Sequence, residues 1–507
     1  MASQSAEPLG EGSQLAAIDL GSNSFHLIIA RIEHGEMRPV EALAEKVQLG
    51  AGLKNGKLSR AAIERGLDCL TRFAQLLEHV EPERMRIVGT NALRQASNRK
   101  ELTRAAKEIL GQRVDVIYGR EEARLVYLGV AHTLADDAQS RLVVDIGGGS
   151  TEFIIGERFE PQHLESLQMG CVSYGQACFA NGEISKAAFK AAYDRASVET
   201  SHIRHEYHSG NWEECVGSSG TLNAIEMILS SNGMSSGGIT RDGLEKLRKR
   251  LLKFERVQDI RLEGLSEPRR SVIVPGVAIA LALFDVLDID VMRASKGALR
   301  EGVIYDLMGR LQHEDVRERT ISALTQRFGA DDETAAIVDS RARILFRATR
   351  KPWKLERSDG DLLHWAARSH EIGMNISHKH FHRHSAYLLR NADLPGFSQG
   401  EQEQLAVLAQ GHRGKLTEEL FEQAPDGDRD RLLKLLTLIR LAALFKYVEK
   451  LEQLPDFMIV AGEDRLALGF PEGWLEAHPL TAQELANERQ SLARLGIRLS
   501  IVQSDQA

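Results

Sequence analysis

The segment DIGGGSTEF, residues 145–153, places three consecutive glycines between two acidic residues, Asp145 and Glu152. Glycine loses more backbone freedom on folding than any other residue, so three in a row indicate a tight turn or a backbone that lies against a ligand. Apolar runs flank the turn at residues 142–144 and 153–155. An apolar run, a glycine-rich turn and a second apolar run are typical of a β-hairpin.

The same pattern occurs a second time upstream. AAIDLGSNSFHLIIA, residues 16–30, aligns without gaps on LVVDIGGGSTEFIIG, residues 142–156, so that Asp19 matches Asp145. A third stretch rich in glycine and serine, VGSSGTLNAIE, follows at residues 216–226. We interpret the first two segments as a duplicated hairpin, one copy in each of two related domains.

The backbone N–H groups of such turns form a concave, partly positive cradle that binds phosphate oxygens. A carboxylate at each edge repels a bare phosphate, but it becomes useful when a divalent cation lies between the two, and Mg²⁺ is the usual choice. We therefore expect Asp145, Glu152 and Asp19 to be the metal-side carboxylates. The alternative is a purely structural hairpin whose aspartate caps its own turn, and the repetition of the pattern argues against it.

Length and composition set further limits. A chain of 507 residues is long enough for several domains, and its formal net charge of −8 argues against bulk affinity for nucleic acid. The four cysteines are widely spaced, and residues 1–14 lack the basic and apolar regions of a secretory signal. The apolar run at residues 271–287 is short for a membrane crossing and contains Pro275, so we expect a buried helix. These features predict a cytoplasmic protein without an integral membrane segment.

Seven motifs occur in order between residues 16 and 307, namely DLGSNSFHLIIA, GTNALRQASN, GREEARLVYLGV, DIGGGSTEF, MGCVSYG, GSSGT and SKGALREGVIYDL. Together they resemble the exopolyphosphatase / guanosine pentaphosphate phosphohydrolase family, and the resemblance continues through the C-terminal third, as in its longer bacterial members. It implies an α/β fold with two ribonuclease-H-like domains of the actin and Hsp70 type, followed by an α-helical HD-like domain and a small C-terminal α+β domain. The expected domain boundaries are 1–135, 136–310, 311–451 and 452–507.

The resemblance places the catalytic glutamate in the EEAR motif. Glu122 is the expected base, Glu121 is the neighbouring candidate, and Glu152 is expected to help orient the attacking water. The residues around the motif, 118–130, predict a turn followed by a helix. Acidic residues in a first helical turn are also favoured by the helix dipole, so a capping role is the alternative for both glutamates of the motif.

The expected phosphate-binding residues lie on the two hairpin turns and on two loops. Arg94 follows an apolar strand, and loops at the carboxyl ends of strands are where open α/β sheets place ligands. The resemblance implies that Arg94 contacts phosphate, and a surface salt bridge is its alternative. The full expected set is Ser22, Asn23, Ser24, Arg94, Gly147, Gly148, Gly149, Ser150, Thr151, Gly220 and Thr221.

Two other functions fit parts of the pattern. GSSGT, residues 217–221, occupies the position of the nucleotide-binding stretch in related kinases, but the sequence shows no sugar-binding set to go with it. A non-catalytic scaffold of the actin type would bind a nucleotide without hydrolysing it, and the EEAR motif argues against this. Hydrolysis of a phosphoanhydride needs phosphate positioning, charge neutralisation and a group that activates water, and this chain supplies all three.

The C-terminal third lacks glycine-rich hairpins, and we expect amphipathic helices there, for example over residues 429–451. Residues 364–397 resemble the HD superfamily of metal phosphohydrolases. His370 and Glu371 stand where that superfamily has His-Asp, so we expect a degenerate, metal-free domain. The last segment, 452–507, alternates apolar and polar residues and predicts a small β-containing domain.

Six basic residues gather within residues 378–384. Alternate histidines are frequent metal ligands, but this spacing points them in different directions outside a strand, and Arg383 would repel a cation. An ordinary solvated loop is another interpretation. We expect a basic lining for a long polyanion, a polyphosphate channel formed by His378, Lys379, His380, His382 and Arg383.

The sequence therefore predicts an exopolyphosphatase that removes terminal orthophosphate processively from inorganic polyphosphate with Mg²⁺. The alternative within the family is hydrolysis of guanosine pentaphosphate, and the motifs do not separate the two substrates. The resemblance also implies a homodimer, and it leaves open whether K⁺ is an activator and whether the protein associates peripherally with the inner membrane.

Overall fold

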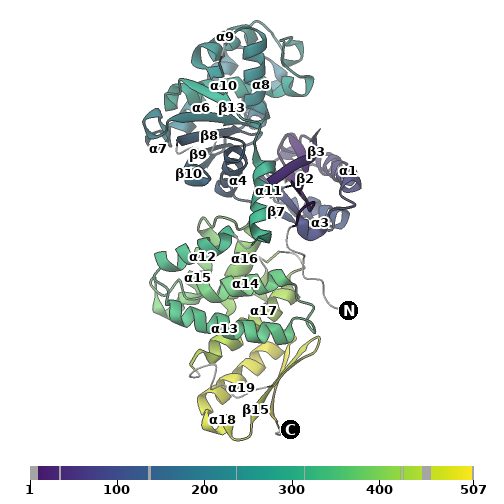
Figure 1. Ribbon diagram of the computed structural model, residues 1–507, viewed down its shortest axis with the longest axis vertical. Helices are drawn as coiled ribbons and strands as arrows, with labels where there is room; N and C mark the ends of the chain where they lie inside the picture. Colours follow the sequence, from purple (N-terminus) through teal and green to yellow (C-terminus); the bar gives the residue numbers. More distant parts are fainter. Residues whose placement is uncertain are drawn as a thin grey trace. The chain divides into compact units, whose positions relative to one another are not determined.

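The computed structural model describes residues 10–33, 36–134, 139–235, 237–312, 315–422, 424–425, 427–447 and 458–504. The chain divides into two compact units, Met1–Asp315 and Val316–Ala507 (Figure 1). The first unit contains two mixed β-sheets and their helices. The second contains a helical domain and a small sheet. Each unit is described by itself.

The upstream hairpin forms the centre of a five-stranded sheet. Its strands are β1 (Gln14–Leu20), β2 (Ser24–Glu33), β3 (Glu36–Lys46), β6 (Met85–Gly89) and β7 (Val114–Val116). The helices of this domain are α1 (Arg60–Leu76), α2 (Asn91–Gln95) and α3 (Arg99–Leu110), and a short ribbon pairs β4 (Leu53–Lys54) with β5 (Lys57–Leu58). The strand order is β3-β2-β1-β6-β7, with β1, β2 and β3 antiparallel and β6 and β7 parallel to β1.

The second hairpin forms a six-stranded sheet in the same way. Its strands are β8 (Ser140–Ile146), β9 (Thr151–Glu157), β10 (Glu160–Leu167), β11 (Glu214–Ser218), β12 (Ile239–Thr240) and β13 (Val291–Ala294). Its helices are α5 (Cys171–Cys178), α6 (Lys186–Ser201), α7 (Arg204–Tyr207), α8 (Ser219–Ser231), α9 (Arg241–Leu251) and α10 (Arg270–Leu287). The strand order is β10-β9-β8-β11-β13-β12, with β11 parallel to β8.

The two hairpins share one register. Asp19 lies opposite His26 in the first, and Asp145 lies opposite Glu152 in the second. In both domains the first hairpin strand also pairs with a parallel strand on its other side. The duplication and the two actin-like domains predicted from the sequence are therefore confirmed.

The apolar run at residues 271–287 lies within α10, as predicted. Glu267–Leu287 is the only helix within the described ranges whose length and composition would allow a membrane crossing, and 78% of its most apolar stretch is buried inside the protein. Its side chains pack against residues of the second sheet in one hydrophobic core. The burial accounts for the apolar composition, because a helix that is apolar all round needs partners on every face.

Two helices, α4 (Gly119–Ala131) and α11 (Leu299–Leu311), pack on each other and against both sheets. The hydrophobic core around them contains Ala17 of the first sheet and Val143 of the second, together with Leu125 of α4 and Val303 of α11. Figure 1 shows α11 running between the two sheets. These helices therefore form the structural link between the two domains of the first unit.

The second unit is mainly helical. Its helices are α12 (Val316–Arg327), α13 (Asp332–Thr349), α14 (Arg357–Ser369), α15 (Phe381–Asn391), α16 (Gln399–Gly411) and α17 (Arg429–Leu444). The small sheet has the order β14-β15-β16, from β14 (Met458–Ala461), β15 (Arg465–Pro471) and β16 (Arg498–Ser504), and carries α18 (Trp474–Ala477) and α19 (Pro479–Ala493).

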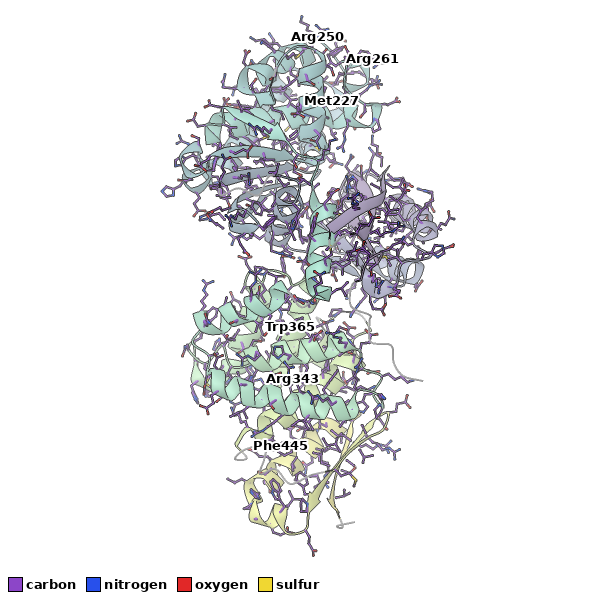
Figure 2. All side chains as sticks on the ribbon, in the orientation of Figure 1. Met227, Arg250, Arg261, Arg343, Trp365 and Phe445 are labelled. Carbon is purple, nitrogen blue, oxygen red and sulfur yellow. The ribbon has the colours of Figure 1, made fainter. Side chains whose placement is uncertain are left out.

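One hydrophobic core joins the helical part to the small sheet. Trp365 and Phe445, labelled in Figure 2, belong to it together with Leu466 and Leu468 of β15. The helix predicted over residues 429–451 ends earlier, at Leu444, and a short 3₁₀ turn follows it. Residues 448–451 of the predicted span lie outside the described ranges. The predicted helical domain and small C-terminal sheet are confirmed.

Candidate functional site

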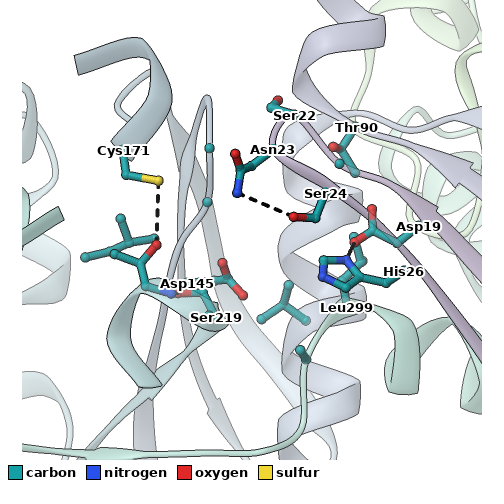
Figure 3. A pocket seen from close by; sticks show the side chains of 18 of the residues that line it. Asp19, Ser22, Asn23, Ser24, His26, Thr90, Asp145, Cys171, Ser219 and Leu299 are labelled. Carbon is teal, nitrogen blue, oxygen red and sulfur yellow. Dashed lines mark hydrogen bonds and ion pairs between the residues drawn. The ribbon is translucent and has the colours of Figure 1, made fainter. Parts of the chain in front are cut away.

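A pocket of about 290 Å³ lies between the two hairpin turns of the first unit. In Figure 3, Asp145 and Cys171 lie on one side of it and Asp19 and His26 on the other. Of the predicted site residues, those that line the pocket are Asp19, Ser22, Asn23, Ser24, Glu122, Asp145, Gly147, Gly148, Gly149, Ser150, Gly220 and Thr221. Residues predicted from segments far apart in the sequence thus meet at one cavity.

The two turns face each other directly. A Cβ atom placed on Gly148 would lie 3.0 Å from Cβ of Ser22 and 3.4 Å from the backbone nitrogen of Asn23. A side chain at residue 148 would therefore press on the opposite turn. Glycine at this position allows the two backbones to approach each other around a ligand.

The N-terminus of α5 holds the second turn in place. The carbonyl of Gly147 accepts from the N–H of Cys171 at 3.0 Å, and the carbonyl of Gly148 accepts from the N–H of Val172 at 2.8 Å. No hydrogen bond among the described residues uses the N–H groups of Gly148 or Gly149. With its carbonyls engaged by the helix, the turn keeps donors available for an anion.

The third glycine-rich stretch contributes the N-terminus of α8. Ser219 has a φ of +88°, an uncommon value for a residue with a side chain, and its Oγ accepts from the N–H groups of Thr221 and Leu222. Strained backbone of this kind persists where surrounding structure enforces it, often at functional sites. The first turn of a 13-residue helix, with its partial positive charge, lines the pocket here.

Glu122 is the carboxylate that α4 presents to the pocket. Arg94 donates from Nη1 to Oε2 of Glu122 at 2.5 Å and to the carbonyl of Ile117 at 3.0 Å. Burial raises the pKa of Glu122, and the positive charge of Arg94 acts in the opposite direction. A carboxylate that is buried yet paired with an arginine combines an elevated pKa with a fixed orientation.

Glu121 points elsewhere. It is bound by Arg124 through two hydrogen bonds of 2.8 and 2.9 Å and is buried, and it does not line the pocket. The EEAR motif therefore places one glutamate in the pocket and the other in an ion cluster. Sequence reasoning could not choose between them from the motif alone.

The remaining predicted carboxylates crowd the same region. Burial and the charge of Glu122 raise the pKa of Asp145 to about 7, and burial together with Glu122 and Asp145 raises the pKa of Glu152 well above its usual range. Oδ2 of Asp19 contacts Nδ1 of His26 at 3.2 Å, while its Oδ1 is buried without a hydrogen-bond partner among the described residues. This group of neighbouring carboxylates fits a cation shared with a ligand.

The pocket residues fit a metal ion only if the ligand supplies some of its coordinating oxygens. No group of three or more His, Cys, Asp or Glu side chains in the described ranges is arranged to hold a metal by itself. Mg²⁺ in phosphate-binding sites commonly takes one or two carboxylates and completes its shell with phosphate oxygens and water. Asp19 and Asp145 are the side chains of this pocket that could supply those carboxylates.

Three predicted residues support the pocket without lining it. Arg94 binds Glu122, and its buried Nη2 has no partner among the described residues. Glu152 accepts from Oγ of Ser166 at 2.9 Å, and Thr151 donates to the carbonyl of Met169 at 2.5 Å. They lie on the strand and helix just behind the pocket wall.

Sequence reasoning missed the cations that line the pocket. These are Arg269, Lys296 and Arg300. Lys296 and Arg300 belong to the motif SKGALREGVIYDL, whose presence was a usable signal although no role was assigned to them. No sequence pattern pointed to Arg269. Its guanidinium lies against Gly220, where a Cβ atom would come within 1.8 Å of Nη2.

The basic residues predicted as a channel all belong to the second unit. His378, Lys379, His380 and Arg383 are exposed or partly exposed, while His382 is half-buried with its ring 6.4 Å from that of His412. Burial and the charges of Arg413 and Arg383 lower the pKa of His382. The channel stays a prediction.

The degenerate HD position is occupied by an ion pair. Lys446 donates from Nζ to Oε1 of Glu371 at 2.7 Å, and that oxygen lies 3.6 Å from Nε2 of His370. Nδ1 of His370 contacts the carbonyl of Ala367 at 2.7 Å, and burial lowers the pKa of the ring. A lysine thus neutralises the carboxylate that stands in the HD position.

Comparison with known proteins identifies the family to which the chain belongs. Residues 28–311 match the family described as "Ppx/GppA phosphatase family", and residues 316–489 match "Ppx/GppA phosphatase, domain III". The chain is similar to proteins named guanosine-5'-triphosphate,3'-diphosphate pyrophosphatase. That of Photobacterium profundum is 40% identical, over 97% of this chain and 98% of the relative, and that of Vibrio vulnificus is 38% identical, over 97% and 99%.

Solved structures agree with the fold. A Ppx/GppA family member from Aquifex aeolicus is 27% identical with a TM-score of 0.50, covering 60% of this chain and 98% of that chain. An exopolyphosphatase from Cytophaga hutchinsonii is 24% identical with a TM-score of 0.54, covering 59% and 98%, which supports the fold alone.

A substitution at Gly170 tests the role of the second turn. A Cβ atom at Gly170 would lie 2.4 Å from the backbone of Gly148 and Gly149, so Gly170→Ala must displace that turn. We expect at least a tenfold weaker affinity for inorganic tripolyphosphate with Mg²⁺, about 1.4 kcal/mol, measured by calorimetry. Gly175→Ala in α5 is the control, because its Cβ would meet only ordinary contacts at 3.7 Å. Equal affinity in both variants would contradict a phosphate-binding role.

The raised pKa of Asp145 predicts a pH-dependent stability. A carboxyl whose pKa is about 7 in the folded protein and about 4 when unfolded binds its proton more tightly when folded, so the free energy of unfolding falls as pH rises through this range. Three pH units correspond to roughly 4 kcal/mol. In EDTA we expect the free energy of unfolding of Asp145→Asn to exceed that of the wild type by roughly 2–4 kcal/mol at pH 8 and to equal it near pH 4, measured by denaturant unfolding.

The same variant tests the cation. Millimolar Mg²⁺ should raise the Tm of the wild type at pH 8 and leave that of Asp145→Asn almost unchanged, because the variant lacks the carboxylate charge. Asp194→Asn, which removes an exposed carboxylate of α6, serves as the control and should respond like the wild type. A response in Asp145→Asn equal to that of the wild type would exclude Asp145 from the cation site.

Proposed function

This chain belongs to the Ppx/GppA phosphatase family, and we propose that it hydrolyses the terminal phosphoanhydride of guanosine pentaphosphate, releasing orthophosphate and leaving guanosine tetraphosphate. The support for this substrate is similarity along nearly the whole chain, at about 40% identity, to proteins named for it. The sequence motifs had put polyphosphate first and the pentaphosphate second. The relatives favour the second.

One observation carries the proposed chemistry: a buried glutamate, Glu122, lines a pocket formed by three glycine-rich turns and is held by Arg94. A general base works best when its pKa is near the working pH, and burial moves the pKa of Glu122 in that direction. The arginine keeps the carboxylate oriented and favours its charged form. Glu122 is therefore the candidate base.

We propose the following course for the reaction. The N–H groups of both turns and the N-terminus of α8 bind the oxygens of the terminal phosphate. Glu122 accepts a proton from a water molecule as the water oxygen bonds to the terminal phosphorus. The bond between that phosphorus and the bridging oxygen breaks, and the bridging oxygen leaves with its electron pair on the shortened chain. Little covalent chemistry falls to the protein, because positioning and charge stabilisation dominate phosphoryl transfer.

Mg²⁺ is the proposed cofactor, held by Asp19 and Asp145 together with phosphate oxygens. When bound, it would neutralise negative charge on the phosphate chain. Arg269, Lys296 and Arg300 add positive charge along the pocket wall, which favours a substrate that carries several phosphates. Whether K⁺ acts as an activator is tested by replacing K⁺ with Na⁺ in the assay.

Inorganic polyphosphate is the second candidate substrate. The observation that favours it is the exposed basic segment around Lys379, which suits a long polyanion. Both substrates end in the same terminal phosphoanhydride, so one pocket can serve both. The distinction between them is quantitative and concerns kcat/KM.

A side-by-side assay separates the two substrates. With Mg²⁺ and purified protein, we expect kcat/KM for guanosine pentaphosphate to exceed that for long-chain polyphosphate, measured as released orthophosphate. A higher kcat/KM on polyphosphate would reverse the assignment. Absence of phosphate release from both would favour the non-catalytic scaffold.

Substitution of the candidate base tests the mechanism. Glu122→Gln keeps the size of the side chain but cannot accept a proton, so we expect kcat to fall roughly 100- to 10,000-fold while substrate still binds. The acid limb of the pH–rate profile should vanish in this variant and remain in Glu121→Gln. The opposite pattern would move the base to Glu121.

A further inference from the structure

Five charged side chains are buried together beside α4, outside the pocket. They are Arg86 of β6, Glu121 and Arg124 of α4, and Asp306 and Arg310 of α11. All but Arg310 are less than one-tenth exposed. None of these five lines the pocket.

Asp306 is the centre of this cluster. It accepts from Nη1 of Arg86 at 2.5 Å, from Nε of Arg310 at 2.7 Å, and from Arg124. Burial alone would raise the pKa of Asp306, but the guanidinium groups of Arg124, Arg310 and Arg86 hold it well below its usual range. The carboxylate therefore stays charged and connects three elements of the fold.

One of those elements, α4, carries the candidate base Glu122, and another, β6, leads into the helix that carries Arg94. Arg124 binds Asp306 and also binds Glu121 through two hydrogen bonds, which fixes the first turn of α4. Glu122 is the next residue, and successive side chains on a helix differ in direction by about 100°. Holding Glu121 in the cluster thus directs Glu122 into the pocket.

The other element is β6. Arg86 lies on this strand, and the strand leads directly into α2, which carries Arg94. Asp306 is therefore joined through Arg124 to the segment of Glu122 and through Arg86 to the segment of Arg94. The 2.5 Å contact between Glu122 and Arg94 depends on the relative placement of these two segments.

The packing of α4 on α11 makes this coupling stiff. A Cβ atom on Gly302 would lie 1.7 Å from the carbonyl oxygen of Leu125, and one on Gly129 would lie 2.1 Å from that of Ala298. The helices thus meet backbone to backbone, with no side chains between them to absorb a shift. Movement of α11 at Asp306 must be passed on to α4.

A buried ion cluster of this kind is weak evidence for stability, because the cost of removing charges from water offsets much of their attraction. Its recognised value is to specify one arrangement. We propose that Asp306 is a positioning residue, which sets the geometry of Glu122 and Arg94 by binding Arg124 and Arg86 together. This inference rests on the proposed function, since it takes Glu122 as the base.

Asp306→Asn tests the proposal in the full-length protein. Asparagine keeps the shape but lacks the charge that holds three arginines, so α4 and β6 lose their common anchor. We expect kcat to fall at least tenfold with KM changed less than threefold, because the phosphate-binding turns remain intact. The acid limb of the pH–rate profile should move to higher pH, because a weaker contact with Arg94 leaves the pKa of Glu122 higher.

The control is Glu214→Gln, which removes the carboxylate that binds Arg141 at 2.9 Å between β8 and β11, at the strand ends away from the pocket. It should lower Tm but keep kcat and the position of the acid limb. If Asp306→Asn behaves like this control, at a temperature where both are folded, the cluster is only structural and the proposal fails.

A milder variant covers the case in which Asp306→Asn does not fold. Arg124→Lys keeps the charge but cannot bind Glu121 through two bonds and Asp306 at the same time. It should show the same loss of kcat and the same displacement of the acid limb, and an unchanged profile would overturn the proposal. If the wild-type protein has no phosphatase activity, both the proposed function and the positioning role are overturned. If the wild type and both variants are equally active, only the positioning role is overturned.

Discussion

The pocket is governed by one electrostatic constraint: a buried space cannot hold several carboxylates and a phosphate chain without opposite charge. Charges a few ångströms apart interact far more strongly in the protein interior than in water. Asp19, Glu122 and Asp145 line the pocket, and burial already raises the pKa of the last two. Arg94, the N-terminus of α8 and the pocket-lining Arg269, Lys296 and Arg300 oppose this charge. A phosphate chain would add several negative charges of its own, and these are the physical reason for proposing that a divalent cation enters together with the substrate.

The duplicated hairpin explains how two sides of one pocket arise from similar sequences. Both copies have the same register, so Asp19 and Asp145 hold equivalent positions beside the two turns. The residues opposite the two aspartates differ, since His26 faces Asp19 and Glu152 faces Asp145. The same hairpin backbone therefore places a histidine beside the aspartate in the first copy and a second carboxylate beside it in the second copy. The two sides of the pocket thus differ in the groups that accompany their aspartates.

The fold could be predicted because its signals are local. The glycine turns, the alternation around them and the long apolar run of α10 each fall within about twenty residues, and all three predictions are confirmed. The site was only partly predictable, because its decisive contacts are long-range. Glu121 and Glu122 are equivalent in the motif, and Asp306 and Arg94 distinguish them from positions far along the chain. Arg269 reaches the pocket through its fit against Gly220, which no pattern in the sequence records.

The size of the pocket bears on how substrates are distinguished. Pockets that enclose a whole small-molecule ligand measure roughly 300–1,000 Å³, and this one, at about 290 Å³, falls at the lower limit. In the proposed function this pocket takes the terminal phosphates, and the rest of the substrate extends beyond it. The proposed chemistry at Glu122 therefore involves only the terminal phosphates, which both candidate substrates share. Under this proposal, preference for nucleotide or polymer has to come from contacts with the rest of the substrate, beyond the pocket that Arg269, Lys296 and Arg300 line. Binding energy from contacts away from the terminal phosphate can raise kcat only if it helps to position the terminal phosphorus for attack by water.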